Sequence, residues 1–115
     1  SVQNVFQNIP TTVGLGGTPQ AITAQTTAPN ITTTITTINT TSGNHTGTIS
    51  ETNVVQGQIK HIVQIAGTNT STLTVTTGVG ISQIVFNAVG DSVTLIWTGG
   101  STGWAVIGSH SATIS

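Results

Sequence analysis

Apolar and polar residues alternate along much of the second half of the chain, which is the pattern of half-buried β-strands. The segments "GQIKHIVQIAG" (57–67), "STLTVTTG" (71–78) and "ISQIVFNA" (81–88) each contain this alternation. The residues predicted to share a face are Ile59, His61, Val63 and Ile65 in the first, Leu73 and Val75 in the second, and Ile84, Phe86 and Ala88 in the third. Because His61 falls among aliphatic residues, we predict that it lies in the core or in an interface.

The segment "ITTTITTI" (31–38) spaces its isoleucines by four and three residues, as a helix would. Every residue in it is β-branched, and prolines and glycines lie on both sides, so we predict a strand. Short strands with turn residues every ~8–12 positions are typical of sandwiches and barrels. We therefore predict an all-β fold for residues 31–115, a single small β-sandwich or barrel of the jelly-roll kind.

Residues 1–30 differ from the rest, with three prolines and the glycine-rich stretch "GLGG". Proline cannot donate to a β-ladder, so a central strand is not expected here. Four apolar residues, Val2, Val5, Phe6 and Ile9, favour an extended N-terminal arm that docks on another surface. The alternative is a loosely ordered terminus.

The stretch "GDSVTLIWTGGSTGWAVIGSH" (90–110) contains both tryptophans and predicts a hairpin with the six-residue loop "TGGSTG". The expected cross-strand pairs are Trp97 with Trp104, Leu95 with Val106, and Val93 with Gly108. Directly opposed residues share a face, so we expect the two indoles to meet.

The reverse side of this hairpin is also apolar, with Ile96, Ala105 and Ile107. A hairpin that is apolar on both faces is normally covered on both sides. One cover would be the domain core and the other a neighbouring subunit. We therefore assign five residues to the core or to a subunit interface, namely His61, Trp97, Trp104, Ile96 and Ile107.

Charge is almost absent from the 115 residues, because Lys60, Glu51 and Asp91 are the only charged side chains. Nucleic-acid binding and anchoring to a membrane surface both need clustered lysine or arginine, so we expect neither. Threonine hydroxyls take the place of charge at the surface. A chain with so little charge is tolerable when copies or partners cover much of its surface, which predicts an assembled structural protein.

The chain contains no cysteine, which removes disulfides and thiolate chemistry and leaves the redox compartment open. No apolar run approaches the ~18–20 residues of a membrane-spanning helix. Ser1 suits a cytoplasmic protein whose initiator methionine was removed, although a processed secreted chain can also begin this way.

No arrangement of residues predicts catalysis, so we expect a protein that is not an enzyme and has no cofactor. We predict that His45 in "SGNHTG" lies at a loop tip, that His110 is solvated and that Asp91 braces a turn. Lys60 is a possible partner of Asp91 or Glu51. The histidines are too widely spaced for a zinc site within one chain, and the alternative is a meeting of His61 residues on a trimer axis.

Threonine rows such as "TLTVTT" leave open a further alternative, an ice-binding or surface-binding protein. Ice-binding solenoids need a fixed repeat so that each coil presents the same row, and no constant period occurs here.

The segments "GQIKHIV" (57–63) and "FNAVGDSVTLIWTGG…GWAVIGSHSATI" (86–114) carry a resemblance to known proteins. The second half of the chain resembles a C-terminal module of virion proteins of tailed phages, notably marine ones. These modules share a "GQ-x-K-x-I" strand, a "GDSV-x-L" strand, a tryptophan and "VIG", in this order. Residues 1–56 do not extend the resemblance.

The resemblance implies a non-enzymatic virion component, found among capsid decoration (cement) proteins, fibres and tail proteins. A small domain with an N-terminal arm suits a cement protein, which commonly forms a homotrimer and adds strands to the major capsid protein. The implied location is the capsid surface, after synthesis in the host cytoplasm. The alternative is a short fibre or tail module that binds a receptor or glycan, with Trp104 stacking on a sugar ring.

Overall fold

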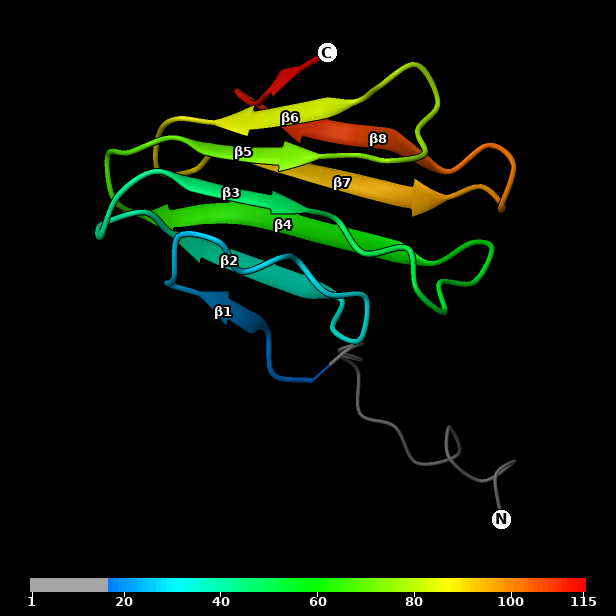
Figure 1. Cartoon of the computed structure of the whole chain (residues 1–115), viewed down its shortest axis with the longest axis horizontal. Coiled ribbons are helices and arrows are strands. Elements are labelled where there is room, and N and C mark those ends of the chain that lie inside the picture. The colour runs from blue at the N-terminus through cyan, green and yellow to red at the C-terminus, as the bar shows by residue number, and fades with distance from the viewer. Residues whose placement is uncertain (1–16) are drawn as a thin grey trace, which may run out of the picture.

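The computed structural model describes residues 17–115, which fold into two β-sheets packed face to face (Figure 1). The arm residues Val2, Val5, Phe6 and Ile9 lie outside the described residues. The strands are β1 (Gln20–Ile22), β2 (Ile35–Asn39), β3 (His45–Thr48), β4 (Ile59–Ala66), β5 (Ser71–Thr74), β6 (Gln83–Phe86), β7 (Ser92–Trp97), β8 (Trp104–His110) and β9 (Thr113–Ile114). The predicted all-β sandwich is confirmed.

One sheet has five strands in the order β1-β2-β4-β7-β8, and the other has four in the order β3-β5-β6-β9. Their facing sides form one apolar core. Its members are Ile22, Ile38, Ile49, Ile62, Leu73, Val75, Ile84, Phe86, Val93, Leu95, Trp97 and Trp104. Burying large side chains of this kind is worth roughly 1.5–3 kcal/mol each, so this layer supplies most of the favourable folding energy.

From β1 to β5 the chain winds back and forth between the two sheets. The strand pairs β1–β2, β2–β4 and β3–β5 are all parallel. They are parallel because the chain crosses to the other sheet before it comes back to form the next strand of the same sheet. Residues 25–29 continue this winding beside β3, where Thr46 N–H donates to the carbonyl of Gln25 over 2.9 Å and Ser50 N–H to that of Pro29 over 3.2 Å. Residues 20–30, grouped with the arm from the sequence, therefore include β1 and this paired segment.

The strand pairs formed by β6 and the strands after it are antiparallel, and β7 and β8 form the predicted hairpin. Trp97 lies opposite Trp104 and Leu95 opposite Val106, as expected. The third expected pair is wrong. A β-bulge between Thr94 and Leu95 shifts the register, so Val93 pairs with Ser109 instead of Gly108.

The alternation predicted for residues 59–65 is correct, but the side that carries Ile59, His61, Val63 and Ile65 faces outward and not into the core. Lys60, Ile62 and Gln64 point into the sandwich and are buried, whereas His61 is exposed on the outer side. Assignment of His61 to the core is therefore wrong, and its place in an interface stays a prediction. Two smaller differences concern "ITTTITTI", where the strand begins only at Ile35, and Ala88, which is exposed beyond the end of β6.

Candidate interaction surfaces

The outer side of the five-stranded sheet carries an unusual number of aliphatic residues. Strand alternation and register place fourteen residues there, which together we name the isoleucine face: Ala21, Ile35, Thr37, Asn39, Ile59, His61, Val63, Ile65, Ser92, Thr94, Ile96, Ala105, Ile107 and Gly108. Ile59, Ile96 and Ala105 form one row across three strands, and the other members lie in neighbouring rows. The sheet is thus apolar on both sides, as the sequence predicted for its hairpin.

Three isoleucines of the isoleucine face are open to solvent in the isolated chain, whereas Ile59, Val63 and Ile96 are half-buried. Ile65 is 52% exposed, Ile107 is 56% exposed and Ile35 is 37% exposed. Soluble sheets with one open side commonly turn polar residues outward, so the isoleucine face of this mixed sheet is a candidate interaction surface.

The outer side of the four-stranded sheet has the opposite character. Thr46 and Thr48 of β3 lie in register with Thr72 and Thr74 of the parallel strand β5, and we name these four residues the threonine face. These pairs of threonines form rows that extend over two strands only, because Val85 and Gln83 occupy the corresponding positions of β6. Hydroxyl groups keep this side hydrated, so the two outer faces of one sandwich differ in chemistry.

His61 lies within the isoleucine face, between Ile59 and Val63 along β4. Its Nδ1 atom is 2.9 Å from the hydroxyl oxygen of Thr94 on β7. Nε2 has no hydrogen-bond partner among residues 17–115. His61 therefore offers one further hydrogen-bonding nitrogen inside a mostly aliphatic surface.

The two indoles meet in the core, as predicted. The ring centroids of Trp97 and Trp104 are 5.3 Å apart with an interplanar angle of 72°, an edge-to-face contact. Trp104 is fully buried, and its Nε1 atom has no hydrogen-bond partner among the described residues. Stacking of Trp104 on a sugar ring is therefore excluded in this conformation, and that prediction is wrong.

Lys60 points inward at one end of the core and contacts no carboxylate of residues 17–115. Its Nζ atom donates to the carbonyl of Thr33 over 2.9 Å and to the hydroxyl of Thr33 over 3.1 Å, and it lies 3.4 Å from Oδ1 of Asn30. Burial lowers the pKa of Lys60 from 10.5 to about 8. The ion pair with Asp91 or Glu51 that the sequence left open is not formed.

His45 is buried at the start of β3, so the predicted loop tip is wrong. Its Nε2 donates to the carbonyl of Thr27 over 2.6 Å, and Nδ1 lies 2.8 Å from the hydroxyl of Ser71. Because the carbonyl can only accept, Nε2 carries a hydrogen, and in the tautomer with hydrogen on Nε2 alone the Ser71 hydroxyl donates to Nδ1. A serine beside a histidine resembles the start of a hydrolytic site, but both side chains are closed to a substrate.

The two carboxylates both stabilise loops. Glu51 accepts hydrogen bonds from the backbone N–H of Thr77 over 2.7 Å and from its hydroxyl over 3.0 Å. Asp91 accepts from the N–H groups of Asn87 and Ala88, which confirms the predicted turn brace. His110 is exposed, as expected. Within the described part of the chain, no three histidine or acidic residues lie together as metal ligands would.

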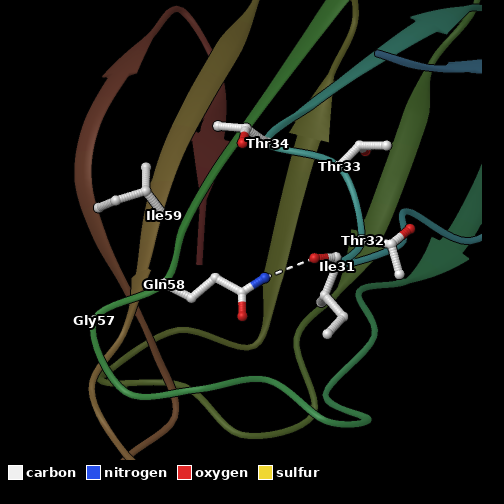
Figure 2. Close-up of a pocket in the computed structure, with 7 residues that line it drawn as sticks. All are labelled: Ile31, Thr32, Thr33, Thr34, Gly57, Gln58 and Ile59. Carbon is white, nitrogen blue, oxygen red and sulfur yellow. Dashed lines mark hydrogen bonds between the residues drawn. The ribbon is translucent and has the colours of Figure 1, made fainter. Parts of the chain in front are cut away.

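A cavity of about 340 Å³ opens where β2 and β4 begin to separate, between residues 31–34 and 57–59 (Figure 2). The backbone pairing starts only where His61 N–H donates to the carbonyl of Thr34 over 2.9 Å. Below that point Gln58 spans the gap, with its Nε2 donating to the carbonyl of Ile31 over 2.6 Å (Figure 2). The lining is neutral and combines aliphatic side chains with threonine hydroxyls.

Comparisons with known proteins bear on the fold. No family model and no curated protein matches the chain. A solved structure described as "Structure of a chaperone-substrate complex" is similar over 81% of this chain, with 17% identity and a TM-score of 0.53. The match spans 18% of the length of that other chain, and at this identity the likeness shows the fold alone. Within residues 17–115, the structure has no helix long and apolar enough to cross a membrane.

Proposed function

We propose that this protein is a non-enzymatic virion structural protein, a capsid decoration protein that stabilises the outer head surface of a tailed phage. In this proposal it acts as a homotrimer on the major capsid protein, needs no cofactor and contacts neither nucleic acid nor membrane. The arm residues Val2, Val5, Phe6 and Ile9 contact the capsid by adding a strand to it, which gains affinity from backbone hydrogen bonds without charge.

The observation that carries the proposal is the isoleucine face. Isolated domains rarely leave a sheet face with so many exposed aliphatic side chains in water, whereas components of large assemblies cover such faces with neighbours. The charged side chains make their contacts within the fold, since Lys60 is buried and Asp91 braces a turn. The resemblance of residues 57–114 to phage virion modules points to the same class of protein.

A short fibre or tail module that binds a receptor or glycan is the second candidate. The observation that favours it is the neutral cavity beside Gln58, because threonine hydroxyls and aliphatic groups together suit the polar and apolar sides of a sugar. With Trp104 buried, this cavity replaces the indole as the place where a glycan would bind.

Copy number in purified particles tests the proposal. We expect quantitative mass spectrometry to find the protein near one copy per major capsid protein. A ratio of a few to a few dozen copies per particle would move it to a fibre or tail site. Absence from particles would overturn the virion assignment altogether.

A further inference from the structure

We infer that the isoleucine face is the surface through which copies of this chain bind one another. The inference deepens the proposed function by naming the contact between subunits. It can also hold for a protein that never enters a particle, since it concerns only the chain itself.

The first argument is the contrast between the two outer faces. Both belong to the same sandwich and both are built from β-branched residues, so strand propensity alone does not distinguish them. The threonine face satisfies that propensity with hydroxyls that water can solvate. The isoleucine face satisfies it with Ile59, Val63, Ile65 and Ile96, which gain nothing from water.

The second argument is charge. The isoleucine face contains no charged side chain, so it offers nothing that would select a charged partner. The polar groups near its middle carry no formal charge: His61 and Thr94 bond to each other, and Thr37 and Ser92 lie on either side of Val63. The matching surface must be neutral and apolar, and a second isoleucine face meets that requirement without any other partner.

The third argument is area. A five-stranded sheet with a strand spacing of about 4.8 Å is roughly 24 Å wide. With strands of three to eight residues, the face covers on the order of 500 Å² per copy. Two such faces bury about 1,000 Å², which reaches the lower limit for a specific interface.

The test is the mass of the protein in solution, measured by sedimentation equilibrium over a concentration series. We expect the wild-type chain to form a discrete oligomer, a dimer or trimer of the 11.6 kDa subunit. We expect Ile65→Lys and Ile107→Lys each to reduce the mass to that of one subunit, because association would bury an unpaired ammonium group. Both positions are more than half exposed, so each lysine is solvated in the folded monomer.

The matched control is Thr74→Lys, which adds the same charge to the opposite side of the sandwich. We expect this variant to keep the wild-type mass, with circular dichroism showing that all three variants fold. A wild-type monomer at every concentration would overturn the inference and leave residues 1–16 or another protein to cover the face. Loss of the oligomer in Thr74→Lys, or its persistence in both isoleucine variants, would also overturn it.

The result is separable from the proposed function. A discrete oligomer of a protein that is absent from particles would keep this inference and reject the capsid role. A monomer found at one copy per capsid subunit would do the reverse.

Discussion

Lys60 is the clearest case of a residue whose burial has a measurable consequence. It is the only lysine, the chain has no arginine, and neither tyrosine nor cysteine is present. The side chain is fully enclosed, and three oxygen atoms from Thr33 and Asn30 surround its ammonium group. Among residues 17–115, the ammonium group has these neutral dipoles in place of a counter-ion, so desolvation lowers its pKa.

We expect the folded protein to become more stable as the pH rises from about 8 to about 10.5. The pKa of Lys60 is about 8 in the folded protein, whereas a lysine side chain that is not buried has a pKa of 10.5. Between these values the unfolded chain binds more protons, so the free energy of unfolding increases with pH. Urea unfolding at several pH values across this window measures the change.

The control for this prediction is Lys60→Met, which removes the titrating group and retains an unbranched side chain of similar length. We expect the pH dependence in this window to shrink to that of the terminal amine, which titrates near ~8. An equal slope in the variant and the wild type would show that Lys60 is not its source.

At the scale of elements, the loop of the β7–β8 hairpin needs a glycine at its last position. Gly103 precedes Trp104 and has a φ of 83°, a conformation that residues with a side chain rarely adopt. A Cβ atom at this position would also collide with the carbonyl group of Thr77. Gly100 of the same loop has open space around it and no such φ.

We therefore expect Gly103→Ala to destabilise the fold and Gly100→Ala to change its stability little. The strain and the clash together should lower the free energy of unfolding by more than about 2 kcal/mol for Gly103→Ala. The Gly100 variant should stay within about 0.5 kcal/mol of the wild type. Thermal and urea unfolding of the two variants gives the comparison, and equal losses in both would contradict it.

Local pattern predicted the strand content, the hairpin and the pairing of the indoles, because these depend on neighbours close in sequence. It left open which side of β4 faces the core. The outer side of β4 carries Ile59, Val63 and Ile65, while its inner side has Ile62 between Lys60 and Gln64. The rule that the more apolar side is the core fails when a sheet is apolar on both sides.

The parallel pairs and the buried polar contacts were beyond sequence reasoning for a different reason. Each joins residues that lie far apart in the chain, such as His45 with Ser71 and Thr27, or Lys60 with Thr33. No spacing rule connects such positions. The cavity beside Gln58 was missed as well, since it arises from the separation of two strands whose pairing could not be foreseen.

At the scale of the whole molecule, the charged side chains act within the fold. Glu51 and Asp91 accept hydrogen bonds from nearby backbone groups, and Lys60 is enclosed. In the proposed role, association with a capsid must therefore depend on apolar burial and backbone hydrogen bonds. Salt screens charges that face solvent and acts little on such contacts.

We expect the affinity for capsids that lack the protein to change by about twofold or less when the salt concentration is raised from low to physiological values. A binding series on such capsids at several salt concentrations measures this directly. A steep loss of affinity with salt would contradict the proposed mode of binding and would indicate charge on the capsid side as its source.

The winding of the first five strands has a kinetic consequence. The central strand β4 bonds on one side to β2, which precedes it, and on the other to β7, which follows two further strands. During synthesis β4 therefore has one unpaired edge until β7 forms, and it carries aliphatic groups on both of its sides. Pairings between distant segments form slowly, and open apolar edges recruit other chains in the meantime. The yield of native protein then depends on how quickly β7 pairs with β4. At high expression, we expect slower folding to reduce this yield more than a lower free energy of unfolding does.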